Sequence, residues 1–136
     1  MKQNKTKAPD INLTKRKRAN QIPRARENTY RMLIEQASDG IHTYDFQGNF
    51  IETNSKLCEM LGYTSEELLR LNVKDLVPAE DLAANPIRFE ELRAGKTLLA
   101  ERRLLRKDGS LIPVEISGKM IQEGVLQSII RDISER

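Results

Sequence analysis

Residues 49–68 read NFIETNSKLCEMLGYTSEEL, a strand-like pattern that runs directly into two short helices. Asn54 can cap the first helix with its side chain, and Gly62 can end it in a left-handed conformation. Thr64 and Glu67 stand three residues apart, which is the spacing of a capping box at the start of a second helix. The junction carries caps and core-spaced apolar residues where a catalytic loop would carry nucleophiles or metal ligands. It therefore predicts a non-catalytic element that joins a strand to short helices.

Upstream of this junction, the sequence IHTYDFQGNFIET (41–53) predicts a β-hairpin. Its two strands are expected over about 41–45 and 49–53, with Gly48 supplying the positive φ of the turn. A helix is predicted before the hairpin, because apolar residues recur at i, i+3, i+4 and i+7, and Gly40 is its expected C-terminal stop. The residues of this apolar stripe are Tyr30, Leu33, Ile34 and Ala37.

Downstream of the junction, the pattern changes from helix to strand. A further helix is predicted over about 87–94, and three strands follow, at 97–107, 111–121 and 125–133, joined by glycine-containing turns. In the middle strand, aliphatic residues alternate with polar residues and proline, which predicts one buried face. The order is therefore two strands, several short helices and three antiparallel strands, an α+β fold.

The net charge of +3 is distributed unevenly along the chain. Residues 1–29 hold nine basic side chains and two acidic ones, whereas the remaining residues hold fourteen basic and eighteen acidic ones. The first segment also has few apolar residues, so it cannot bury enough surface to offset its ordering entropy. We therefore expect residues 1–27 to form a basic, disordered arm and residues 28–136 to form one domain. The arm fits a solvated tail, or contact with nucleic acid or an anionic membrane.

Several classes of protein are disfavoured by what the sequence contains. It has no apolar run of the ~18 residues that span a membrane and no signal-peptide pattern, so we expect a cytoplasmic chain without a membrane span. One cysteine, Cys58, and one histidine, His42, are a poor basis for a metal site, and we expect none. The sequence also lacks a glycine-rich phosphate loop and a nucleophile-base pattern, so we expect no enzyme.

Five motifs of this chain, in this order and spacing, closely resemble a PAS domain with its C-terminal PAC segment. The resemblance covers about residues 29–136. Its motifs are ASDGI (37–41), YDFQGNFIETN (44–54), MLGYTSEEL (60–68), RKDGSLIPVEIS (106–117) and RDISER (131–136).

The resemblance implies a PAS fold, with a five-stranded antiparallel sheet in strand order 2-1-5-4-3 and short helices over one face that enclose a small pocket. PAS domains are mostly sensory or dimerising modules of histidine kinases, cyclases, phosphodiesterases and transcription regulators, and they have no chemistry of their own. The resemblance thus implies a signal-transduction module of a two-component or related system. It does not identify the ligand.

Flavin and haem are both disfavoured by the same resemblance. Flavin-binding PAS domains of the light-oxygen-voltage type carry a reactive cysteine in a segment that corresponds to LNVKDLVPAED (71–81), which has none. Cys58 lies one helix earlier. Haem-binding PAS domains carry an axial histidine in a segment that corresponds to AANPIRFEELRAG (83–95), which has no histidine. The cofactor therefore stays unknown.

The expected ligand pocket follows from strand alternation combined with the resemblance. Alternation places His42 and Tyr44 on one face of the first strand, and the resemblance turns that face toward the pocket. His42 can be a satisfied strand histidine, a ligand contact or a group that titrates near neutral pH. The other expected lining residues are Leu57, Leu61, Leu104, Val114, Ile116, Ser128 and Ile130. This mostly aliphatic lining suits either a closed core or a small, largely apolar ligand, while Arg88 can reach inward to an anion or stay in solvent.

Two further regions carry expected interactions. The helix with the stripe Tyr30, Leu33, Ile34 and Ala37 is expected to form a homodimer together with the exposed sheet face. The closing Asp132-Ile133-Ser134 resembles the Asp-Ile-Thr motif that links many PAS domains to an output helix, which implies a downstream signalling domain or partner.

Two functions from different classes are left open at this point. One is a sensory and dimerisation module with a possible small-molecule ligand. The other is a nucleic-acid-associated regulator that uses the basic arm as a tether. Deletion of residues 1–26 separates them, because only the second loses salt-sensitive retention on DNA.

Overall fold

The computed structural model describes residues 24–135 and contains one five-stranded antiparallel sheet, with α2 (Arg24–Gln36) before it. The strand order is β2-β1-β5-β4-β3, as the family resemblance implied. Most of the predicted arm, residues 1–23, lies outside the described residues, and α2 begins four residues before the predicted boundary at residue 28. The strands are β1 (Gly40–Tyr44), β2 (Phe50–Thr53), β3 (Leu98–Leu105), β4 (Leu111–Gln122) and β5 (Val125–Asp132).

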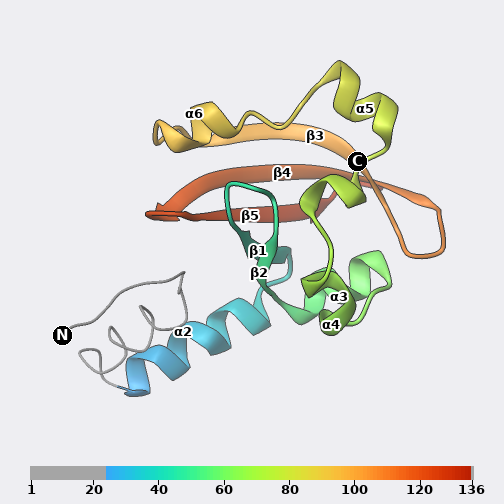
Figure 1. The fold of residues 1–136 in the computed structure, drawn as a ribbon. Helices are drawn as coiled ribbons and strands as arrows, with labels where there is room; N and C mark the ends of the chain where they lie inside the picture. Colours follow the sequence, from blue (N-terminus) through green and yellow to red (C-terminus); the bar gives the residue numbers. More distant parts are fainter. Residues whose placement is uncertain (1–23, 136) are drawn as a thin grey trace. The chain divides into compact units, whose positions relative to one another are not determined.

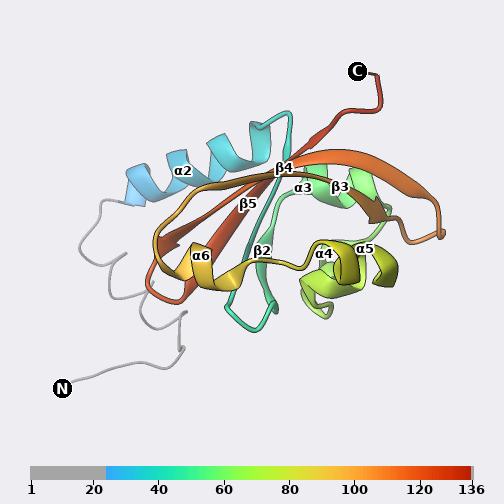
Figure 2. The ribbon, with the colours of Figure 1, turned by 90° about the horizontal axis from the view of Figure 1, so that it is seen from above.

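Within residues 24–135, the helices other than α2 lie between β2 and β3 in the sequence. In Figure 1, α3 and α4 lie beside β1 and β2, whereas the segment from α5 to α6 runs along β3 at the other edge of the sheet. Figure 2, which shows the molecule from above, also has this segment running beside β3. These helices are α3 (Ser55–Leu61), α4 (Ser65–Leu69), the 3₁₀ helix η1 (Val73–Leu76), α5 (Ala79–Ala84) and α6 (Phe89–Arg93).

The helix caps form as the sequence predicted. Asn54 caps α3, and Gly62 ends it with a φ of 82°. Thr64 and Glu67 form a complete capping box on α4, because each side chain bonds the backbone N–H of the other residue. The sequence did not predict α5, whose N-cap is Pro78 and which has no side-chain cap.

The buried amide of Asn54 joins three segments. Its Oδ1 accepts hydrogen bonds from the backbone N–H of Leu57 in α3, at 3.1 Å, and of Ile41 in β1, at 2.9 Å. Its Nδ2 donates to the carbonyl of Asp39, at 3.1 Å. Asn54 is only 1% exposed, so water does not compete for these bonds. One side chain therefore holds the end of β2, the start of α3 and the start of β1 together.

The predicted role of Gly40 as a helix stop is wrong. Gly40 is the first residue of β1, and α2 ends at Gln36. A Cβ at Gly40 would lie 2.8 Å from Leu57 Cδ1, so this position requires glycine for the close approach of α3 to the sheet.

The β1–β2 turn is tied to η1 by a second asparagine. Gly48 takes a φ of 91°, as predicted, and its carbonyl accepts a hydrogen bond from Val73 N–H at 2.8 Å. Asn72 Nδ2 donates to the carbonyl of Gln47, also at 2.8 Å. These bonds fix the turn against the start of the segment that covers the sheet.

We expect Asn54→Ala to lower the free energy of unfolding by about 2–4 kcal/mol, because it removes a helix cap and leaves the buried N–H of Ile41 without its partner. The matched change Thr64→Ala removes an exposed cap and should cost about 1 kcal/mol. Urea denaturation of both variants measures the difference, and equal losses would contradict the central role of Asn54.

Candidate functional site

A cavity of about 90 Å³ lies between the sheet and the segment from η1 to α6. Its walls are largely aliphatic, with Val73, Leu76 and Val77 contributed by η1 and the residue after it. Two small residues on the strands leave the space open, Ala100 on β3 and Gly118 on β4. A Cβ at Gly118 would lie 3.5 Å from Ser128 Oγ and 3.7 Å from Leu92 Cδ2. A side chain larger than alanine at this position would therefore project toward the cavity.

Six of the nine expected pocket residues line this cavity, and they are His42, Tyr44, Leu104, Ile116, Ser128 and Ile130. The other three, Leu57, Leu61 and Val114, are fully buried in the core but are not part of the lining. The expectation for these three is corrected. Leu57 packs directly on the backbone of Gly40 in β1, so no cavity forms between them. Leu61 and Val114 are likewise packed into the core. The cavity opens instead at the opposite half of the sheet, under the segment from η1 to α6.

The strand face of the cavity has a polar floor. His42 is 5% exposed, and its ring stacks between Tyr44 and Phe50, with centroid distances of 5.0 Å and 4.7 Å. Ser128 Oγ donates a hydrogen bond to the hydroxyl of Tyr44 at 3.1 Å. His42 Nδ1 is buried and has no hydrogen-bond partner among the described residues. A buried polar atom of this kind costs free energy unless a water or a ligand satisfies it.

Burial determines the ionisation of both aromatic floor residues. Burial lowers the pKa of His42 from 6.5 to about 3, so its imidazole is neutral at physiological pH. Burial also raises the pKa of the Tyr44 phenol, which therefore keeps its proton. The floor offers neutral hydrogen-bonding groups, and His42 does not titrate near neutral pH in the folded protein.

Two arginines and an asparagine line the cavity at its more exposed side. Arg102 extends from the same face of β3 as Leu104, while Asn85 and Arg88 come from the segment between α5 and α6. Partial burial lowers the pKa of Arg102, and the nearby charge of Arg88 acts in the same direction. Arg102 was not among the expected pocket residues, although it alternates with Leu104 along β3 and so lies on the same face of the strand.

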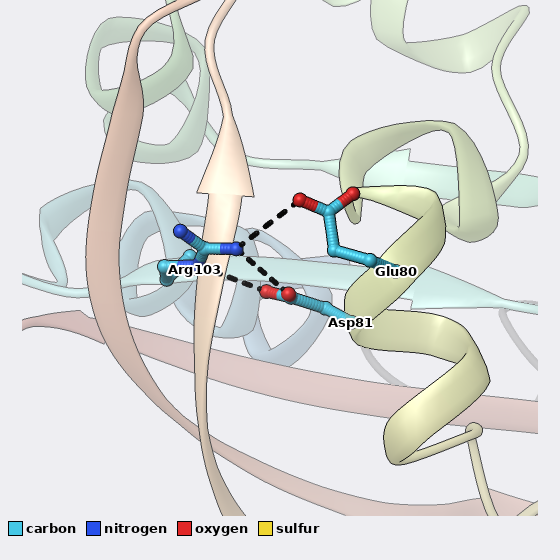
Figure 3. Close-up of polar contacts among 3 residues, drawn as sticks. All are labelled: Glu80, Asp81 and Arg103. Atoms are coloured by element: carbon cyan, nitrogen blue, oxygen red, sulfur yellow. Dashed lines mark hydrogen bonds and ion pairs between the residues drawn. The ribbon is translucent and has the colours of Figure 1, made fainter.

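The segment from η1 to α6 forms the cover of the cavity, and contacts of arginine side chains hold it at α5 and at α6. Arg103 on β3 bonds both carboxylate oxygens of Asp81 on α5, at 2.7 and 3.0 Å, and lies 3.7 Å from Glu80 (Figure 3). The guanidinium of Arg93 on α6 lies 4.1 Å from the centroid of the Phe46 ring in the β1–β2 turn. The cover is thus pinned to β3 at α5 and to the turn at α6.

A flavin or a haem does not fit this site. A water-sized sphere occupies about 10–15 Å³ by this volume measure, so the cavity holds roughly six to nine non-hydrogen atoms. Both cofactors are several times larger. Cys58 lies on α3 and is not a lining residue, and His42 belongs to the strand floor and stacks between two rings.

The expected output motif lies at the end of β5. The Asp132 carboxylate accepts hydrogen bonds from the N–H and the hydroxyl of Ser134, and these bonds lower the pKa of Asp132. The N–H of Ile133 donates to the carbonyl of Pro113 on β4, at 3.1 Å. The backbone is therefore held on both sides of Ile133 as it leaves the sheet.

The fold and cavity described above define a PAS domain. The family model described as a PAS domain matches residues 38–135, and the chain belongs to this family. PAS domains are non-catalytic sensory modules, and this chain is homologous to sensor regions of signalling proteins.

Two curated relatives are much longer than this chain. The methyl sulfide methyltransferase-associated sensor of Methanosarcina acetivorans is 27% identical over 114 residues, which cover 81% of this chain and 11% of the relative. The probable diguanylate cyclase DgcE of Escherichia coli is 31% identical over 88 residues, which cover 63% of this chain and 8% of the relative. The chain therefore spans about a tenth of the length of these relatives.

Solved structures of PAS domains superpose on most of the chain. A domain of a sensory box sensor histidine kinase/response regulator from Geobacter sulfurreducens has a TM-score of 0.71 and 31% identity, covering 79% of this chain and 94% of that one. The PAS domain of an HTR-like protein from Haloarcula marismortui has a TM-score of 0.66 and 28% identity, covering 79% and 99%.

Among residues 24–135, no helix has the length and apolar character needed to cross a membrane. No group of three or more His, Cys, Asp or Glu side chains is placed to hold a metal ion among the same residues.

The burial of His42 predicts a stability loss in mild acid. Its folded pKa lies below its unfolded pKa of 6.5, so below pH 6.5 the unfolded chain binds a proton that the folded chain does not. The free energy of unfolding should therefore fall by about 1.4 kcal/mol per pH unit. Relative to His42→Gln, we expect wild type to lose about 2 kcal/mol between pH 8 and pH 5 in urea denaturation. If the pH profiles of wild type and His42→Gln are parallel, His42 titrates in the folded protein as it does in the unfolded chain, which would contradict the effect of its burial.

Proposed function

We propose that this PAS domain is a cytoplasmic sensory module that binds a small molecule in its cavity, acts as a homodimer and signals through Asp132-Ile133-Ser134. The observation that supports ligand binding is the cavity, which is lined by His42, a residue whose buried Nδ1 has no hydrogen-bond partner among the described residues. A closed core would normally leave neither the space nor the unsatisfied polar atom. The lining of aliphatic walls with a few polar groups is typical of small-molecule sites.

Dimerisation is supported by exposed apolar residues on two separate surfaces. On the sheet face opposite the cavity, Leu99 and Ile129 flank Ser117 in one cross-strand row and are 64% and 38% exposed. On α2, Met32 and Leu33 are 55% and 62% exposed. Ile34 and Ala37 of the predicted stripe are half-buried, whereas the side chain of Tyr30 lies outside the described residues. Exposed apolar surface of this kind favours burial against a partner.

Signal output through the end of β5 is supported by its position. Ser128 and Ile130 line the cavity, and Asp132 follows on the same face of the strand. A change in cavity occupancy therefore acts on the strand whose next residues leave the sheet. The partner or downstream domain that receives the signal would connect at this exit.

Native mass spectrometry of the protein as purified from cells tests the ligand and the dimer together. We expect two chains of 15.6 kDa with an additional small-molecule mass per chain. If the dimer has only the polypeptide mass, also after incubation with metabolites from a cell extract, ligand binding is contradicted and the domain is an interaction module. A monomer of bare mass would contradict both proposals.

We expect Leu33→Glu to shift the protein from dimer to monomer, because it places a charge on an apolar stripe that a partner would bury. Size-exclusion chromatography with light scattering measures the mass. Leu69→Glu is the matched control, since Leu69 is also exposed, at 42%, but lies on α4 outside the proposed interface. If Leu33→Glu is still a dimer, the exposed apolar stripe of α2 is not part of the interface.

A further inference from the structure

We propose that the cavity binds a small monocarboxylate, with its charged group held by Arg102 and Arg88 and its short apolar body between the aliphatic walls. This inference rests on the proposed function, because it names the ligand class of the same cavity. It depends on the charges at the exposed side of the cavity, the polar floor and the volume, which are independent observations.

Two arginines, Arg102 and Arg88, supply positive charge at the exposed side of the cavity. Arg102 is half-buried on the cavity face of β3, and within the described residues no carboxylate forms an ion pair with it. Arg88 contacts Glu91 at 3.6 Å, an exposed pair of the kind that contributes little. The guanidinium groups of Arg88 and Arg102 are close enough to repel each other. A half-buried cation without a carboxylate is a site for an anionic group.

The nearby acidic groups are already engaged by other cations. Asp81 is the acidic neighbour that acts electrostatically on Arg102, and both of its oxygens bond Arg103. Glu91 lies between Arg88 and Lys96, with Lys96 Nζ at 3.8 Å. These carboxylates reduce the positive potential but do not occupy the fork of Arg102. A planar carboxylate matches that fork with two parallel hydrogen bonds.

The size and the remaining lining define the rest of the ligand. A volume of about 90 Å³ corresponds to roughly six to nine non-hydrogen atoms, the range from butyrate to benzoate. Most of the wall is aliphatic, which suits a hydrocarbon or aromatic body and not a sugar or a polyanion. The floor is neutral at His42 and Tyr44, so it does not attract a second charge.

The experiment compares acids with their uncharged amides. Butyrate, hexanoate and benzoate, and separately butyramide, hexanamide and benzamide, are titrated into the full chain while backbone amide NMR shifts are recorded. We expect at least one acid to bind with a dissociation constant tenfold or more below that of its amide. The shifts should be concentrated on β3, β5 and the segment from α5 to α6.

Four variants locate the interaction. Arg102→Gln should weaken binding of the acid tenfold or more, while Arg102→Lys should retain part of the affinity, because it keeps the charge but not the fork. Arg70→Gln removes an exposed arginine at the end of α4 and should leave the affinity unchanged. Ala100→Leu fills the cavity and should abolish binding of acids and amides alike. Unfolding midpoints of all variants establish that they are folded.

Each other outcome overturns the carboxylate proposal in a distinguishable way. If acids and amides bind equally and Ala100→Leu abolishes both, the cavity is a ligand site but not an anion site, and the proposed sensory function stands. If binding of the acid survives both Arg102→Gln and Ala100→Leu, the acid binds elsewhere. If no acid or amide binds, the carboxylate proposal fails, and the native mass measurement alone decides whether the cavity has any ligand.

Discussion

The buried amide of Asn54 is the constraint on which the arrangement of this domain depends. A hairpin and a helix that follow each other directly can diverge at many angles, because one or two flexible residues join them. Asn54 removes this freedom by bonding the backbone of β1 and the first turn of α3 at once, in a place without water. With α3 fixed, Leu57 must pack on the backbone of Gly40, and the helices that follow can only continue across the remaining part of the sheet. The closed half of the core, under the first turn of α3, results from this position.

Features that depend on local bonds were predictable from the sequence. The caps at Asn54 and Thr64 and the positive φ of Gly48 and Gly62 are determined within four residues, so composition and spacing revealed them. Gly40 was misinterpreted, because glycine after a helix and glycine under a packed helix look identical in sequence. The helix α5 was missed because its start lacks a side-chain cap and its tie to the sheet, Asp81 to Arg103, joins residues 22 positions apart. Contacts over such distances leave no local pattern.

The residues of the candidate site also divide into those that a local pattern could predict and those that it could not. Strand alternation placed His42, Tyr44, Leu104, Ile116, Ser128 and Ile130 on the cavity face, because a period of two requires only the correct register. Alternation could not show which end of that face is filled, and Leu57, Leu61 and Val114 were assigned to the cavity for this reason. The same rule applies to Arg102, but it was not used there, because a charged residue in a strand is normally expected to face solvent. The position of Arg102 indicates a binding site only once the cavity beside it is known.

The two halves of the core differ in what holds them, and this difference bears on how a ligand could act. Around α3 the packing is aliphatic and fully buried, so opening there would expose core side chains. Over the cavity, η1 and α6 also contribute buried apolar residues, but α5 has none. The pair Arg103 to Asp81 holds α5 at partly exposed positions, where an ion pair stabilises little. Local opening favours the region with few buried apolar contacts. Within the segment over the cavity, α5 is therefore the part with the least buried surface to lose on local opening. On the opposite wall, β5 lines the cavity at Ser128 and Ile130 and ends two residues later at Asp132, so the cavity wall and the exit of the chain belong to one continuous strand.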